Sequence, residues 1–180
     1  KEPITIEWMN GIKKDEIVID IGANIGMYTL MSGVGREAIV YGFEPEASNY
    51  HLLVKNIKLN SMHDRIKTYC AGVLDYDGFS DLNIDDEVDD TLGGSNYSVD
   101  EEVGFDLKPM KVGYKQGINV ITLDSFCRKM KIIPDHIKID VDGLEHRVIK
   151  GALEYITQAK TVIIELNTNL KEHKVLVSLI

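Results

Sequence analysis

The stretch EIVIDIGANIGMYTLM, from Glu16 to Met31, decides the fold that we predict for this chain of 180 residues. Its first half is an apolar, β-branched run that stops at Gly22, as a buried strand does. Apolar residues then follow at the i, i+3, i+4 and i+7 spacing of a helix: Met27, Leu30, Met31 and Val34. The stretch therefore predicts a strand, a glycine turn and a helix. Because Gly22 and Gly26 lack a Cβ atom and the helix start offers free N–H groups, we expect the turn to bind a nucleotide-like or carboxylate-bearing ligand.

The composition indicates a single acidic domain over residues 1–180. The formal net charge is -9 and the basic residues are scattered, so we expect no nucleic-acid partner. No apolar stretch approaches the roughly 20 residues that span a bilayer, and the N-terminus lacks the features of a signal peptide, so we expect a soluble protein with no membrane partner. Cys70 and Cys127 are isolated in the sequence, which fits the reducing cytoplasm.

Strand and helix patterns alternate along the chain at the length of βαβ units. After the first strand, further strands are predicted over Ala38–Pro45, Ile66–Val73, Ile118–Thr122, Ile137–Val141 and Thr161–Asn167. The acidic, turn-rich segment Leu74–Gly117 interrupts this rhythm and is interpreted as an insertion of hairpins and loops. The pattern predicts an α/β, Rossmann-like three-layer sandwich with a mostly parallel sheet. Leu170–Ile180 resembles the start of a helix, and no strand pair follows it.

Polar and glycine residues gather where the predicted strands end. In an open parallel sheet, ligands bind beyond these carboxyl ends, so the candidates are expected to share one edge. Glu44 ends the second strand about twenty residues beyond the glycine turn, the separation at which a carboxylate accepts hydrogen bonds from a ribose. A carboxylate that closes an apolar strand is costly to bury without a partner, which favours a functional role for Glu44.

The turn itself discriminates between cofactors. A nicotinamide dinucleotide prefers G-x-G-x-x-G, whereas here Asn24 stands at the second glycine position. We therefore favour S-adenosylmethionine, which has a ribose and an amino-acid tail. The alternatives are a nicotinamide-dependent oxidoreductase, a non-catalytic cofactor-binding domain, and a methyltransferase that acts on a protein or nucleic acid.

Several motifs in order resemble the FkbM-type family of S-adenosylmethionine-dependent methyltransferases. They are VIDIGANIGMYTL, GFEPEASNYHLLVKNIKLN, TLDSF, IKIDVDGLEHRVIKGA and VIIELN. The resemblance implies a class I methyltransferase fold and methyl transfer to a hydroxyl of a sugar or another small molecule. The uncovered edge of the last predicted strand would invite a partner, so a homo-oligomer is possible. Two departures are Asp142, where the family usually has glutamate, and the missing final strand pair, which indicates a truncated or minimal member.

The resemblance and the strand ends together give the candidate site. The residues expected to contact the cofactor are Asp20, Gly22, Ala23, Asn24, Gly26, Glu44, Pro45, Ala71 and Asp140. Asp140 is the first candidate for orienting or deprotonating the acceptor hydroxyl, with Glu145 and His146 behind it.

Some of these candidates also have an alternative interpretation. Asp140, Glu165 and Asn167 could instead hold a Mg²⁺ ion, although metal dependence is not favoured. Asp142 and Glu145 have the spacing of the N-cap and N3 positions of a helix, which would be a structural role. Asp20 could orient the backbone of the glycine turn without touching a ligand.

Overall fold

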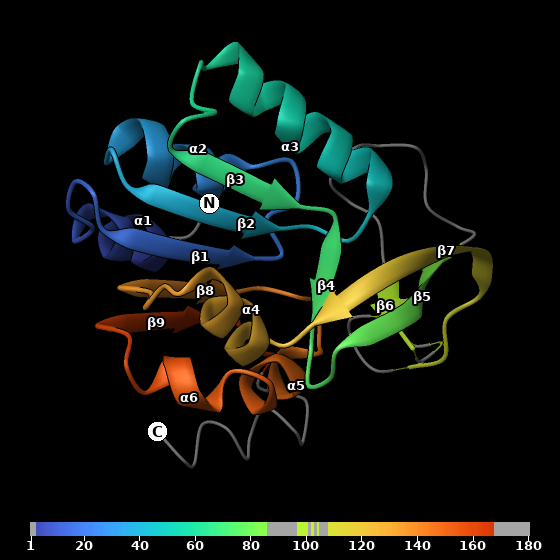
Figure 1. Ribbon diagram of the computed structural model, residues 1–180. Coiled ribbons are helices and arrows are strands. Elements are labelled where there is room, and N and C mark those ends of the chain that lie inside the picture. Colours follow the sequence, from blue (N-terminus) through green and yellow to red (C-terminus); the bar gives the residue numbers. More distant parts are fainter. Residues whose placement is uncertain (1–2, 86–96, 101, 103, 105–107, 168–180) are drawn as a thin grey trace.

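The computed structural model describes residues 3–85, 97–100, 102, 104 and 108–167. Five described strands form a parallel sheet in the order β3-β2-β1-β8-β9 (Figure 1). They are β1 (Ile17–Ile21), β2 (Ile39–Phe43), β3 (Ile66–Tyr69), β8 (His136–Ile139) and β9 (Thr161–Ile164). The first predicted strand, β1, lies at the centre and pairs with β2 on one side and β8 on the other.

Helices cover both faces of this sheet, which confirms the three-layer sandwich. One face is covered by α1 (Pro3–Asn10), α2 (Met27–Leu30) and α3 (Ala47–Leu59), and the other by α4 (Leu123–Met130), α5 (Glu145–Lys150) and α6 (Leu153–Ile156). Side chains alternate along a strand, so Val18 packs in the core on the α1 and α3 side. Ile19 and Ile21 pack on the α4 side instead.

The helix ends follow local side-chain chemistry. Glu46 caps α3, because its carboxylate accepts hydrogen bonds from the backbone N–H groups of Ser48 and Asn49. Asn60 is the C-cap of α3. The N-cap of α4 is Thr122, whose hydroxyl accepts a hydrogen bond from the N–H of Ser125. The helix predicted after the glycine turn is α2 followed directly by a π-helical turn, η1 (Met31–Gly35).

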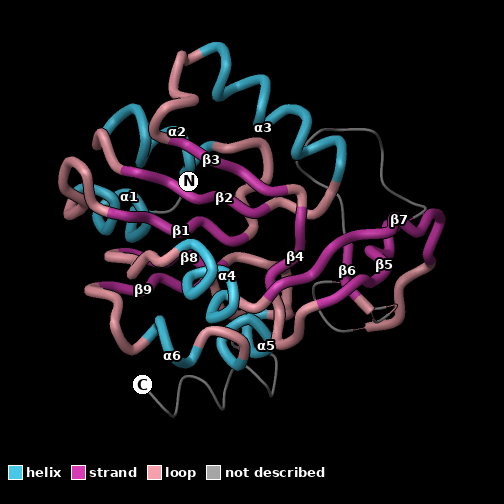
Figure 2. The backbone as a smooth tube through the Cα atoms, viewed as in Figure 1, coloured by secondary structure: helices cyan, strands magenta, loops and turns pink. Residues whose placement is uncertain are grey.

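A second sheet stands beside the parallel one (Figure 2). Its described strands are β4 (Ala71–Val73), β5 (Gly78–Asp85), β6 (Tyr97–Val99) and β7 (Val112–Ile121), in the order β4-β7-β5-β6. The hairpin pairing of β5 with β6 and β7 confirms the expected hairpins of the insertion.

Two strand predictions are wrong because of this second sheet. The expected strand Ile66–Val73 is divided at Cys70, where the chain leaves the parallel sheet as β3 and enters the second sheet as β4. The expected strand Ile118–Thr122 is the end of β7 and pairs with β4 and β5, not with the parallel sheet. The strands β4 and β5 on its two sides supply its hydrogen-bond partners.

The end of the chain also differs in detail from the prediction. The helix expected from Gly143 is two short helices, α5 and α6, separated at Gly151. A Cβ atom on Gly151 would lie 1.9 Å from the carbonyl oxygen of Leu74, so this position requires glycine. The expected helix Leu170–Ile180 lies outside the described residues. No described helix is long and apolar enough to cross a membrane.

Candidate active site

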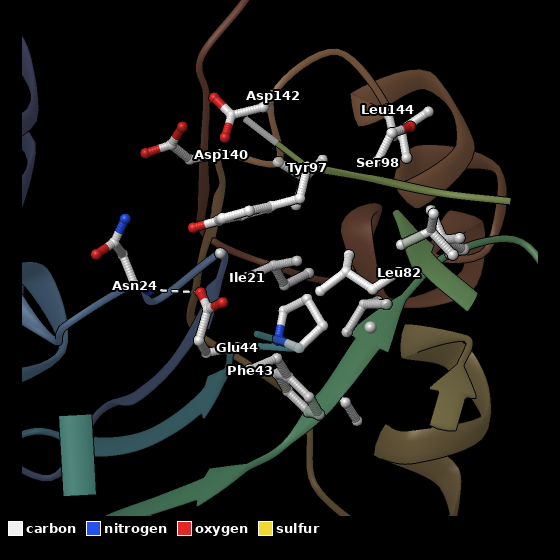
Figure 3. Close-up of a pocket in the computed structure, with 18 of the residues that line it drawn as sticks. Ile21, Asn24, Phe43, Glu44, Leu82, Tyr97, Ser98, Asp140, Asp142 and Leu144 are labelled. Carbon is white, nitrogen blue, oxygen red and sulfur yellow. Dashed lines mark hydrogen bonds between the residues drawn. The ribbon is translucent and has the colours of Figure 1, made fainter. Parts of the chain in front are cut away.

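A cavity of about 410 Å³ opens at the carboxyl ends of β1, β2 and β8, where the second sheet faces the parallel one (Figure 3). The chain passes from β1 to β2 on one side and returns through β8 on the other, so this edge is the point at which the winding reverses. Ligands of open α/β sheets bind at such a point. The volume lies in the range of small-molecule sites.

The glycine turn brings the ends of β1 and β8 into contact. Gly22 has a φ of 78°, and a Cβ atom there would lie 1.7 Å from the carbonyl oxygen of Asp140. The N–H groups of Gly22 and Ala23 both donate to the carbonyl oxygen of Phe43, at 3.0 and 2.9 Å. Gly26, with a φ of 96°, is the N-cap of α2. The turn is therefore fixed against both neighbouring strands by its own backbone.

Glu44 lies at the floor of the cavity with 2% of its surface exposed. Its two carboxylate oxygens accept hydrogen bonds from the N–H of Asn24 at 2.8 Å and from the N–H of Glu46 at 2.9 Å. Burial, reinforced by the charges of Glu46 and Asp142, raises the pKa of Glu44 to about 7. Each oxygen keeps a second lone pair for a ligand hydroxyl.

Asp140 belongs to a charge cluster with Lys138 and Asp20. The Lys138 ammonium is buried, 2.9 Å from an oxygen of Asp140 and 3.4 Å from an oxygen of Asp20. Burial opposes the charge of Lys138, but the two aspartates outweigh it and raise the pKa of Lys138. The hydroxyl of Thr29 donates to Asp20 at 2.6 Å. These contacts of Asp20 are thus with side chains of α2 and β8.

The structure brings together a large part of the predicted site. The cavity is lined by six of the expected residues: Gly22, Asn24, Glu44, Pro45, Ala71 and Asp140. The other expected residues do not line it: Asp20, Ala23, Gly26, Glu145 and His146. Of these, Ala23 and Gly26 belong to the turn itself, and Glu145 contacts the backbone of the loop after β8.

The loop after β8 is held differently from the sequence prediction. Asp142 is not a helix cap, because it has a φ of 53° and the N-cap position of α5 falls at Leu144. The buried carboxylate of Glu145 accepts instead from the N–H groups of Val141, at 3.1 Å, and Gly143, at 3.0 Å. Glu145 therefore fixes the loop that carries Asp142. Enclosure by the cavity walls and the charges of Asp140 and Glu145 raise the pKa of Asp142 to about 6.

The sequence prediction missed the residues that β5 and β6 of the second sheet contribute. Tyr97 of β6 lies across the cavity between Asp142 and Glu44 (Figure 3). Its hydroxyl accepts a 2.5 Å hydrogen bond from the side-chain amide of Asn49 in α3. Burial and the charge of Glu44 raise the pKa of Tyr97 strongly. Its place depends on pairing between strands distant in sequence, so a local pattern could not reveal it.

The described residues include no cluster of carboxylate, histidine or cysteine side chains arranged to bind Mg²⁺. Among those residues, no group of three or more His, Cys, Asp or Glu side chains could hold a metal ion. Asp140 and Glu165 do line the same cavity.

The fold and the site together define a Rossmann-like methyltransferase architecture. Two solved structures share it over almost the whole chain: a precorrin-6y C5,15-methyltransferase from Geobacter metallireducens GS-15 and an rRNA methylase from Streptococcus thermophilus. The first is 11% identical, with a TM-score of 0.54, over 97% of this chain and 68% of that one. The second is 10% identical, with a TM-score of 0.54, over 99% of this chain and 79% of that one.

The sequence itself identifies the family. Residues 20–179 match the methyltransferase FkbM domain, and the chain belongs to this family. The chain is also 36% identical over 66 residues to a tRNA(Phe) (4-demethylwyosine(37)-C(7)) aminocarboxypropyltransferase from Pyrococcus horikoshii. That match covers 37% of this chain, and the chain spans about a quarter, 24%, of the length of this curated relative.

Proposed function

We propose that the protein is an S-adenosylmethionine-dependent methyltransferase that methylates a hydroxyl oxygen of a small molecule, either a sugar or another hydroxyl compound. The observation that carries the proposal is the position of Glu44 beside the glycine turn, at the point where the sheet winding reverses. Membership of the FkbM methyltransferase family supports it.

The residues of the cavity fit the cofactor. S-adenosylmethionine carries a ribose, a positive sulfonium and an amino-acid group. Glu44 would accept hydrogen bonds from the two ribose hydroxyls, with Pro45 and Ala71 beside the adenine and the Gly22–Gly26 turn beside the methionine part. Four carboxylates line the cavity and favour a cation: Glu44, Asp140, Asp142 and Glu165.

The sulfonium supplies an electrophilic methyl group, so the protein needs mainly to align the acceptor and remove its proton. Asp140 ends β8 at the cavity and would orient the acceptor hydroxyl and accept its proton. Lys138 would hold the Asp140 carboxylate in place through their 2.9 Å contact. Glu145 and His146 would act behind Asp140, and the hydrogen bonds of Glu145 to the loop backbone support a positioning role.

The acceptor is proposed to be a small molecule although some relatives are named for tRNA or rRNA. A net charge of -9 opposes binding to a phosphate backbone, which needs clustered basic residues.

A cofactor titration of the Glu44→Ala variant tests the proposal. We expect affinity for S-adenosylmethionine to fall by about 1–3 kcal/mol, the cost of leaving hydrogen-bond partners unpaired. The exposed Glu37, which pairs with Lys14 away from the cavity, provides the matched control Glu37→Ala. Equal affinity in both variants would refute the ribose assignment. Circular dichroism of each variant checks that it remains folded.

A further inference from the structure

A second cavity of about 310 Å³ lies against the first. Two residues, Asp140 and Glu165, line both cavities. The second cavity extends from them toward the other face of the sheet, where the first turn of α1 and Tyr28 of α2 enclose it. The proposed methyl donor and the second cavity therefore meet at Asp140.

The walls of the second cavity are mainly apolar. They include Ile4, Ile163 and Leu166, while the lining residues Ile139 and Ile164 pack their side chains into the core on the α4 side. The ring of Tyr28 lies 5.1 Å below the Lys138 ammonium, in a cation–π contact that holds both side chains.

The charged groups in this cavity lie at the ends of two strands, Lys138 and Asp140 at β8 and Glu165 after β9, and Thr5 and Tyr28 complete the polar lining. Lys138 keeps 7% of its side-chain surface exposed and Asp140 keeps 28%. Asp140 is therefore the member of the pair that a bound molecule can reach. Lys138 is held behind it by Asp140 and Asp20.

We infer that the second cavity receives the methyl acceptor, and that this acceptor is an alcohol or phenol whose body is apolar. The inference rests on the proposed function, because it needs the methyl donor in the first cavity. A sugar carries hydroxyl groups on all sides, and the isoleucine walls would leave those groups without hydrogen-bond partners. An acceptor with one hydroxyl directed at Asp140 leaves none unpaired.

The arrangement accounts for every atom of the transfer. The acceptor oxygen forms a bond to the methyl carbon while the bond between that carbon and sulfur breaks. The electron pair of the broken bond stays on sulfur, which gives S-adenosylhomocysteine, and the hydroxyl proton passes to the Asp140 carboxylate. Lys138 acts as a positioning residue that touches Asp140 and not the acceptor.

The test uses two isoleucine methyl groups as separate reporters in a nuclear magnetic resonance titration. Ile21 lines the first cavity and Ile163 lines the second. The protein labelled at its isoleucine methyls is titrated with S-adenosylhomocysteine, then with naphthol or with methyl glucoside as probes. We expect S-adenosylhomocysteine to shift the Ile21 signal, naphthol to shift the Ile163 signal, and methyl glucoside to shift neither.

A pair of variants with the same substitution sharpens the test. Ile163→Phe fills the second cavity and should weaken naphthol binding by about tenfold while leaving S-adenosylhomocysteine affinity unchanged. Ile133→Phe, at an exposed position outside both cavities, should change neither affinity. Retained S-adenosylhomocysteine binding shows that each variant is folded.

The possible failures are distinct. If S-adenosylhomocysteine shifts Ile21 but naphthol leaves Ile163 unmoved, or if the glucoside shifts Ile163 equally, the acceptor assignment is overturned and the proposed function stands. If S-adenosylhomocysteine leaves Ile21 unmoved, the proposed function itself fails, and the acceptor assignment fails with it.

Discussion

Replacing Glu44 with glutamine should change the way in which the stability of the protein depends on pH. Burial raises the pKa of Glu44 from its ordinary value of 4.5 to about 7. The folded state therefore holds this proton more tightly than the unfolded state. The stabilisation is present below pH 4.5 and is lost as the pH rises through 7. The difference between these two values corresponds to about 3 kcal/mol of unfolding free energy.

The glutamine side chain does not ionise, so the variant does not lose this stabilisation as the pH rises. Glutamine keeps one acceptor oxygen, so one of the two N–H groups, from Asn24 or Glu46, loses its partner at a cost of about 1–3 kcal/mol. At acid pH we therefore expect Glu44→Gln to be less stable than the natural protein. Relative to that protein, it should gain about 3 kcal/mol as the pH rises to about 8, since at position 44 the glutamate ionises and the glutamine does not.

Urea unfolding, followed by circular dichroism over this pH range, measures the effect. Glu37→Gln is the control, because Glu37 is exposed and its pKa is lowered by Lys14 rather than raised. Its curve should run parallel to that of the natural protein above pH 4.5. Parallel curves for Glu44→Gln as well would show that Glu44 ionises at its ordinary pKa, and the description of a buried carboxylate with a raised pKa would be wrong.

Three further changes test other parts of the account. Gly22→Ala should prevent folding or lower the unfolding free energy in urea by several kcal/mol, because the added Cβ would overlap the backbone of Asp140. The control Gly117→Ala has open space around it and should lower the unfolding free energy by less than about 1 kcal/mol. Similar losses in both variants would contradict the close approach of Gly22 to Asp140. Asp140→Asn should retain cofactor affinity in calorimetry and lose methyl transfer measured by mass spectrometry, and a fully active variant would remove Asp140 from the mechanism. Hydrogen bonds from Lys160 and His136 lower the pKa of Glu16 to about 2, so its stabilisation is present above pH 4.5 and is lost as the pH falls toward 2. Acid unfolding of Glu16→Gln should therefore show a flatter pH dependence by up to about 3 kcal/mol, and an unchanged dependence would exclude this network as a source of stability.

The parallel sheet could be predicted from the sequence because its signals are local. The run Ile17–Ile21, the glycine turn and the strand that ends at Glu44 have the periods of buried strands and helices, and the structure confirms them. The division at Cys70 could not be predicted in this way. The sequence of residues 66–73 has the pattern of one continuous strand. Residues 71–73 nevertheless belong to the second sheet, because they pair with β7, which is distant in sequence.

In the candidate site too, the residues positioned by local sequence could be predicted, whereas those positioned by pairing between distant strands could not. Glu44 and Asp140 could be named because each closes an apolar strand, and strand ends meet at one edge of a parallel sheet. Tyr97 could not, because its position depends on β6 pairing with β5 and on the hydrogen bond from Asn49. The role of Glu145 could not be predicted either, since a glutamate at this position can cap a helix or accept hydrogen bonds from the preceding loop, and the sequence is the same in both cases.

The most direct test of the central claim is a calorimetric titration of the protein with S-adenosylmethionine, S-adenosylhomocysteine and NAD in parallel. The account predicts micromolar affinity for the two adenosyl compounds and no binding of NAD, because Glu44 suits the ribose while Asn24 replaces the glycine that a dinucleotide requires. Preferential binding of NAD, or binding of none of the three, would contradict it.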